Sequence, residues 1–280
     1  MITKNFNSLL LITICLLFTA DISAQQVFSA NELAGTYFAG HDFGGSSIEL
    51  KADGTYSQGH GSCTYSTEES GKFYISNGVV RFTIAKYTGK QFSDEEKEVD
   101  LFDAKARKKF FDYDDDDIEP LETEFSLVPI KWGERIYLIY ESALKDFSNA
   151  VNLGVEPRAE MRSEHYFGAF FLREGDEQKI VSGKPTLPAE WQPFLLSKPV
   201  NAKIVAAEKQ GEDTLGIIDR GRSDGLKAGM ILLGKDEQPS LFSSQGVVVS
   251  VEEKSAKILI FDLKVGDTVN SKYAAKNPYK

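Results

Sequence analysis

Apolar and polar residues alternate with a period of two over much of residues 25–175, the pattern of strands with one buried face. Two such runs flank Asn77-Gly78, a pair that tolerates the positive φ angles of a tight hairpin turn. The pattern predicts strands at residues 35–38, 47–51, 55–57, 72–75, 79–84, 135–140 and 166–172. The predicted fold class is mainly β, with a lipocalin-like antiparallel barrel or strongly curved sheet in this part of the chain.

One segment between these strands has a helical period instead. Ser93 and Glu96 have the arrangement of a capping box at a helix start. The basic residues 107–109 stand near the expected helix end, where they complement the helix dipole. Apolar residues recur at helical spacing at Val99, Phe102, Ala106 and Phe110. We expect one amphipathic helix over residues 94–111, packed on the barrel.

The second half of the chain begins with a proline-rich stretch. Pro185, Pro188, Pro193 and Pro199 predict a linker over residues 176–199, held against a domain by Trp191, Phe194 and Leu195. Strands are then expected at residues 202–207, 215–219, 231–233, 246–251, 256–260 and 264–269. Their even spacing, with glycines at the corners, predicts a second small β-barrel over residues 200–274, with Leu226 and Met230 closing one end and residues 275–280 as a tail.

Two short patterns resemble known families. Residues 33–85 contain Gly35-Thr36-Tyr37 followed by Ile48-x-Leu50-x-x-Asp53-Gly54-Thr55-Tyr56, which resembles the opening strands of lipocalin-like domains in bacterial envelope proteins. That resemblance implies a barrel able to hold a small apolar ligand.

The second resemblance covers residues 200–274. The segment reads Asp219-x-Gly221-x-x-x-Gly225-Leu226-x-x-Gly229-Met230 and later Lys264-x-Gly266-Asp267-x-Val269. This is similar to the small β-barrel domains of bacterial envelope and flagellar assembly proteins, including the rod-shape-determining family. Such domains act by assembly and interaction, which implies no catalytic residue here. The long helix that precedes the barrel in rod-shape proteins is missing from this sequence.

Residues 1–24 have the features of a signal peptide. Lys4 precedes an apolar run at residues 9–18, and Ala24 offers a small residue for cleavage before Gln25. We therefore expect an exported protein, periplasmic or secreted, with residues 25–175 as its first domain. No later segment approaches the length of a membrane helix, so no membrane span is expected. Cleavage would leave Cys63 as a single cysteine, which excludes an internal disulfide.

The net charge comes almost entirely from one insertion. The chain has 32 Lys and Arg against 42 Asp and Glu, a net charge of -10. Residues 91–124 alone hold 14 acidic and 5 basic residues. An acidic chain has no general attraction for phosphate backbones, so nucleic acid is not an expected partner. The acidic loop 112–119 fails the calcium-loop template at Asp117 and Thr123, and an adventitious cation site or a solvated loop both stay open.

Candidate chemistry is confined to two groups of residues. A polar ligand site would use residues of the segment 132–158, namely Trp132, Arg135, Asn152, Glu156 and Arg158. The structural alternative places Trp132 at a barrel end with Arg135 stacked on it, and makes residues 152–154 a simple turn. A metal site would use His60 and Cys63, with His41 brought across the sheet. No nucleophile, zinc-protease or phosphate-loop motif occurs, and no cofactor is predicted.

These observations favour a non-enzymatic envelope protein that binds partners or assembles with them. Its expected partners are other envelope proteins or a small ligand. The alternative is a hydrolase or small-ligand carrier with its site around residues 132–158.

Overall fold

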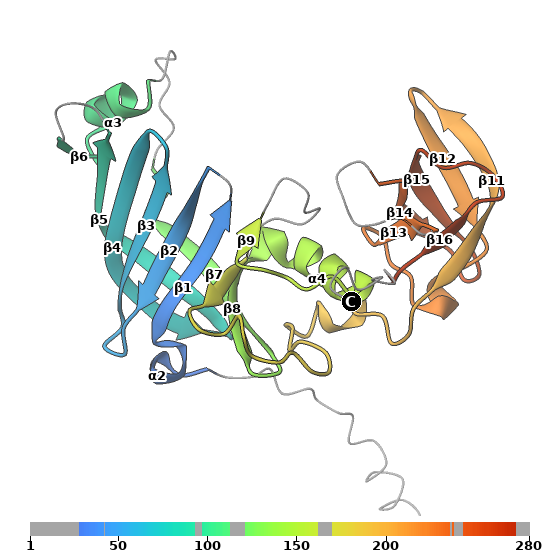
Figure 1. Ribbon diagram of the computed structural model, residues 1–280, viewed down its shortest axis with the longest axis horizontal. Coiled ribbons are helices and arrows are strands. Elements are labelled where there is room, and N and C mark those ends of the chain that lie inside the picture. Colours follow the sequence, from blue (N-terminus) through green and yellow to red (C-terminus); the bar gives the residue numbers. More distant parts are fainter. Residues whose placement is uncertain are drawn as a thin grey trace, which may run out of the picture.

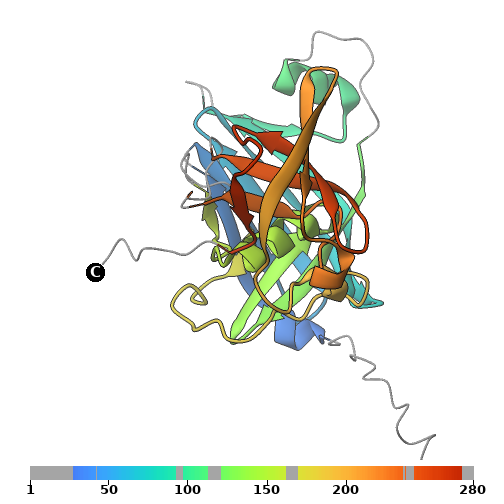
Figure 2. The ribbon, with the colours of Figure 1, turned by 90° about the vertical axis from the view of Figure 1, so that its right-hand side faces the viewer.

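The computed structural model describes residues 28–41, 43–92, 97–112, 121–161, 170–235, 237 and 243–272. Two antiparallel β-barrels stand beside each other, with the first drawn in blue to yellow-green and the second in orange to red (Figure 1). Viewed along the line that joins them, the second barrel stands in front of the first (Figure 2). The mainly β fold class is therefore confirmed. The predicted signal peptide and the tail lie outside the described residues.

The first barrel closes through eight antiparallel strands. Their order is β1-β2-β3-β4-β5-β7-β8-β10, and β10 returns to β1 through the pairs Tyr37–Arg173 and Phe38–Leu172. The strands are β1 (Gly35–His41), β2 (Gly44–Leu50), β3 (Thr55–Ser62), β4 (Tyr65–Ser76), β5 (Val79–Gln91), β7 (Glu124–Trp132), β8 (Arg135–Tyr140) and β10 (Phe171–Arg173). The short helix α2 (Ala30–Leu33) precedes them, and β9 (Glu160–Met161) pairs with β1 in parallel.

Local turn chemistry explains the clearest hairpin. Asn77 and Gly78 have φ angles of 52° and 73°, the left-handed conformations that a two-residue hairpin turn requires. Strands β4 and β5 therefore pair along their whole length, whereas β5 meets β7 only at residues 80–83. The far halves of β1–β5 consequently extend beyond the closed barrel as an open sheet (Figure 1).

The predicted helix over residues 94–111 is wrong at its start. Residues Glu98–Asp100 form β6, which pairs with β5, and α3 spans only Ala104–Phe111. Asp103 caps α3 by accepting hydrogen bonds from the backbone amides of Lys105 at 2.9 Å and Ala106 at 3.4 Å. Phe110 packs edge-on against Tyr65, so the helix does lie on the sheet.

Further segments of the first barrel differ from the predictions. No strand was predicted at residues 124–132, which form β7. Strand β10 spans Phe171–Arg173, and the first part of the strand predicted at residues 166–172 lies outside the described residues. The expected simple turn at residues 152–154 is wrong, because Leu144–Leu153 form helix α4. Gly154, with a φ angle of 73°, ends that helix in the left-handed conformation typical of helix C-termini. The short 3₁₀ helix η1 (Glu141–Ala143) leads into α4.

Aromatic side chains fill the interior of the first barrel. All eight strands contribute to one buried cluster, in which Phe82 stacks on Phe125 with ring centres 4.4 Å apart. Tyr56 meets Phe82 edge-on at 4.9 Å. Apolar burial of this kind contributes about 25 cal/mol per Å², so this cluster is a main source of the first barrel's stability.

The second barrel has six strands in the closed order β11-β12-β15-β14-β13-β16. They are β11 (Asn201–Gln210), β12 (Asp213–Ile218), β13 (Ile231–Gly234), β14 (Gln245–Val251), β15 (Ala256–Phe261) and β16 (Thr268–Asn270). Leu226 and Met230 are each 1 % exposed within its core, as predicted. The strand expected at residues 264–269 is wrong over its first half, because Asp267 accepts from the Lys264 amide and forms a turn.

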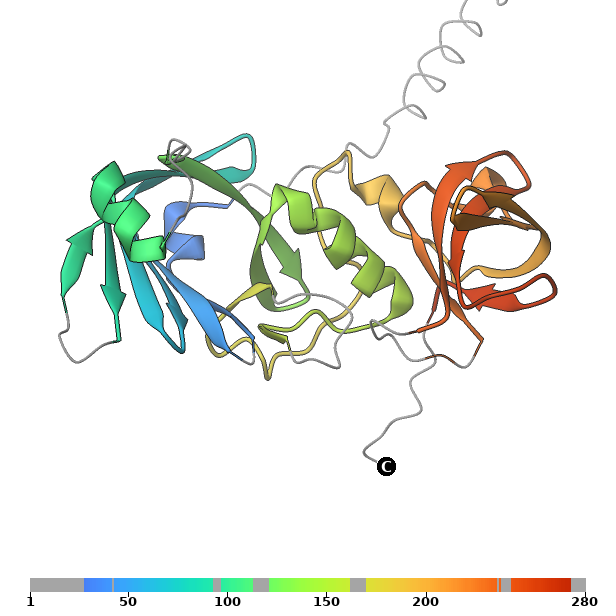
Figure 3. The same cartoon turned by 90° about the horizontal axis from the view of Figure 1, so that it is seen from above.

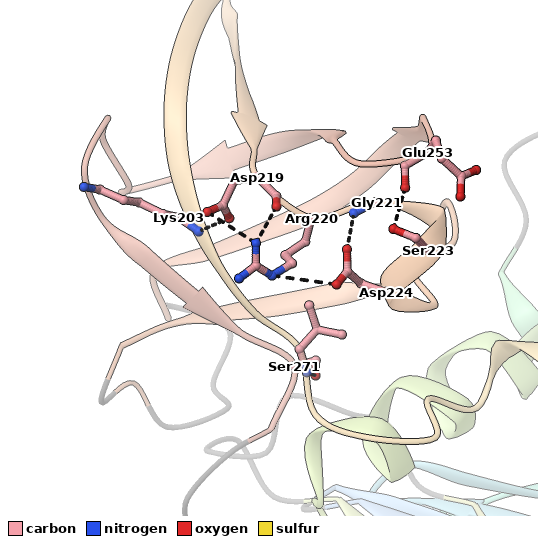
Figure 4. Close-up of polar contacts among 9 residues, drawn as sticks. Lys203, Asp219, Arg220, Gly221, Ser223, Asp224, Glu253 and Ser271 are labelled. Carbon is pink, nitrogen blue, oxygen red and sulfur yellow. Dashed lines mark hydrogen bonds and ion pairs between the residues drawn. The ribbon is translucent and has the colours of Figure 1, made fainter.

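Side-chain carboxylates bind backbone amides at the glycine-spaced corner of the second barrel (Figure 4). Asp219 accepts a 2.8 Å hydrogen bond from the Lys203 amide, and Asp224 accepts one of 3.0 Å from the Gly221 amide at the start of η3 (Arg222–Asp224). A Cβ on Gly221 would lie 2.5 Å from the Glu252 carbonyl oxygen. Gly221 therefore permits a close backbone approach that closes this end of the barrel.

Candidate functional site

Helix α4 lies between the two barrels (Figure 3). Its Leu144, Phe147 and Leu153 are at most 1 % exposed and belong to a buried cluster that also contains Ile231 and Leu233 of the second barrel. A single apolar core therefore continues from the first barrel through α4 into β13. The two barrels are joined by packed side chains as well as by the chain itself.

Two asparagines of α4 add directed contacts to that core. The Asn149 amide nitrogen donates to the Gly229 carbonyl at 3.0 Å, and its Oδ1 accepts from the Ile231 amide at 3.1 Å. Asn149 is 1 % exposed, so these bonds are shielded from water. One side chain thus satisfies both a donor and an acceptor of the second barrel.

Asn152, predicted as a ligand-binding residue, contacts the linker in the same way. Its amide nitrogen donates to the Phe194 carbonyl at 3.0 Å, and its Oδ1 accepts from the Leu196 amide at 2.8 Å. Asn149 and Asn152 are three residues apart and so share a helix face. Both fasten segments beyond residue 190 to α4.

The linker is an ordered part of this junction. Phe194, in the 3₁₀ helix η2 (Gln192–Phe194), is 8 % exposed and packs in the second-barrel core, whereas Leu195 and Leu187 pack in the shared core. Trp191 packs partly buried against both clusters. These contacts anchor the linker through Trp191, Phe194 and Leu195, as predicted.

Arg135 and Glu156 are brought together as an ion pair, as a shared ligand site would require. The remaining guanidinium donors, however, bind backbone: Nε reaches the Lys179 carbonyl at 2.7 Å and Nη2 the Glu177 carbonyl at 2.8 Å. Burial raises the pKa of the neighbouring Tyr137 hydroxyl, which donates to the Pro157 carbonyl. Arg135 is 6 % exposed and holds the loop after β10 against the first barrel.

The same loop receives two further contacts. Asp176, 1 % exposed, accepts from the Ile136 amide at 2.8 Å and forms an ion pair with Lys179. The Trp132 indole nitrogen donates to the Gly183 carbonyl at 2.9 Å, and its ring meets Phe147 edge-on rather than stacking on Arg135. Arg158 is exposed, and its side chain has no polar contact with the described residues.

The predicted metal pair is not joined by further ligands in the described part of the chain. His60 Nδ1 lies 2.9 Å from Ser46 Oγ in the sheet, and the exposed Cys63 contacts the Phe43 carbonyl at 3.7 Å. Within the described ranges, no group of three His, Cys, Asp or Glu side chains is placed to hold a metal ion. The acidic loop lies largely outside them, because residues 113–120 are not described.

A partly buried polar contact on the inner face of the sheet was not predicted. Tyr56 donates from its hydroxyl to Glu69 Oε1 at 3.3 Å. Burial raises the pKa of Glu69 above its usual value, and burial together with the nearby Glu69 charge raises that of Tyr56. The register places Gln58 between Ile48 and Glu69 on the same face. This cluster places a titratable carboxyl group on the inner face of the sheet.

A groove of about 550 Å³ lies mainly on the opposite face of the same strands, although Gln58 and Glu69 also line it. Its other side chains share the outer face because they stand in register between neighbouring strands. The lining includes Thr36, Ser47, Glu49, Ser57, Glu68, Ser70, Lys86 and Thr88. The sequence showed alternating polar positions. It did not show the register between strands, which brings these positions together in one groove.

Comparison of the chain with family models, curated proteins and solved structures found no match. Across the described residues, no helix combines the length and apolar character needed to cross a membrane.

Proposed function

We propose that this chain is an exported envelope protein that acts by binding and assembly, with two barrels presenting their outer surfaces at a fixed spacing. The observation that carries the proposal is the junction at α4, where one apolar core and the amide bonds of Asn149 and Asn152 unite both barrels. A protein that works by presenting surfaces gains from such rigidity, because less freedom is lost on binding.

The contacts of the predicted ligand residues favour this proposal over a hydrolase. Trp132, Asn152 and two of the three guanidinium nitrogens of Arg135 donate to backbone carbonyls of the loop and linker. The packed aromatic interior of the first barrel likewise disfavours an apolar-ligand carrier. The resemblances of residues 33–85 to lipocalin-like domains and of residues 200–274 to envelope-assembly barrels agree with the proposed location and role.

Native mass spectrometry of the protein released from its own cell envelope tests this proposal. We expect a mature chain starting at Gln25, outside the cytoplasm, in a stoichiometric complex. The Asn149→Asp variant places a carboxylate oxygen against the Gly229 carbonyl, so it should loosen the junction and weaken the complex. A cytoplasmic full-length chain, or a bare monomer in the envelope fraction, would overturn the proposal.

A further inference from the structure

We propose that the outer groove of β1–β5 binds an oligosaccharide, an inference that rests on the proposed envelope binding function and names its ligand class. The groove crosses five strands, which lie about 4.8 Å apart, so it spans roughly 19 Å. That length suits several linked sugar units rather than a single one.

The groove presents the hydrogen-bonding groups that a sugar chain requires. The hydroxyls of Ser47, Ser70 and Thr88 can each donate and accept, and have no side-chain partner among the described residues. Glu68 adds a carboxylate acceptor beside them. Sugar hydroxyls also both donate and accept, so this mixture of groups complements them.

The backbone beneath the groove excludes strand addition by a peptide. Strands β2, β3 and β4 are each paired on both sides, so their amides and carbonyls are already bonded. A ligand must therefore be recognised by side chains. Lys86 forms an ion pair with Glu98 at 3.0 Å, and Glu49 with Lys51 at 3.7 Å, which leaves no excess positive charge for a phosphate-rich ligand.

The floor of the groove is shaped by a glycine and a buried threonine. A Cβ on Gly59 would meet only Ser47 Oγ, at 3.6 Å, so the missing side chain leaves open space. Thr88 is 9 % exposed yet lines the groove. Phe38 is 38 % exposed and stands beside Ser47 in the same register row, where its ring offers an apolar surface for a sugar face.

Titration calorimetry on the purified mature protein tests the inference. The probes are tetrasaccharides of β-1,4-linked N-acetylglucosamine and of β-1,4-linked glucose, with inorganic phosphate as an anion. Gly59→Leu should fill the groove and weaken sugar binding at least about tenfold, which is about 1.4 kcal/mol. Gly61→Leu is the matched control, because a Cβ there meets nothing within 4 Å and Gly61 does not line the groove.

Thr88→Val keeps the shape of the floor and removes one hydroxyl, so it should weaken binding by a smaller factor. The inference is supported if Gly59→Leu lowers the affinity for sugar and Gly61→Leu leaves that affinity within twofold of wild type. Absence of sugar binding, binding of phosphate alone, or equal effects of the two leucines would overturn it. These results do not decide whether the envelope complex forms, since native mass spectrometry measures that complex without added sugar.

Discussion

Replacing Asn149 by leucine tests the junction between the barrels most directly. Leucine has nearly the same branched shape but cannot hydrogen bond, so the change removes two bonds of 3.0 Å and 3.1 Å without opening a cavity. A net hydrogen bond contributes about 1 kcal/mol, and each buried group left unpaired costs about 1–3 kcal/mol. We expect local protection at the junction to fall by about 2–4 kcal/mol.

Hydrogen exchange of the Ile231 amide is the assay, because this amide donates to Asn149 itself. A loss of about 2–4 kcal/mol corresponds to exchange faster by roughly 30- to 700-fold. The matched control is Asn201→Leu on the exposed start of β11, which should leave exchange at Ile231 unchanged. If Ile231 in folded Asn149→Leu protein exchanges at the wild-type rate, the asparagine does not hold the junction.

Three more predictions concern other contacts. Burial raises the folded-state pKa of Glu69, so ionisation of this carboxyl lowers stability as pH rises from the usual glutamate range through the folded pKa. Glu69→Gln should therefore raise Tm at pH 7 relative to wild type and change it little at pH 4. An equal shift in Tm at both pH values would contradict this. Gly221→Ala forces a Cβ to 2.5 Å from backbone and should lower the free energy of unfolding by about 1–3 kcal/mol in urea melts, whereas Gly61→Ala should not. Arg135→Met leaves the carbonyls of Glu177 and Lys179 without their donor, so limited proteolysis should cut the loop after β10 faster than in wild type. An unchanged cleavage rate would show that other contacts hold this loop.

Local signals predicted the parts of the fold that local chemistry determines. The hairpin at Asn77-Gly78 needs only two residues with positive φ, and short alternating runs predicted most strands of both barrels but not β7. Helix α3 was misplaced because β6 forms by pairing with β5, a contact between residues eight to twelve apart that a helical period cannot reveal. Helix α4 was missed although the apolar residues Leu144, Phe147, Ala150 and Leu153 recur every three residues, since its neighbours on both sides read as strand and turn.

The residues of the predicted ligand site show a related effect, which concerns backbone groups. Residues 174–199 contain little regular structure, so their carbonyls need donors from elsewhere. Trp132, Arg135 and Asn152 supply those donors, which is why strong hydrogen-bonding residues gather beside this stretch. The groove on β1–β5 is the opposite case. Its backbone is already paired within the sheet, so the hydroxyls of Ser47, Ser70 and Thr88 are not needed to satisfy internal carbonyls, which agrees with the proposed role of this groove in binding.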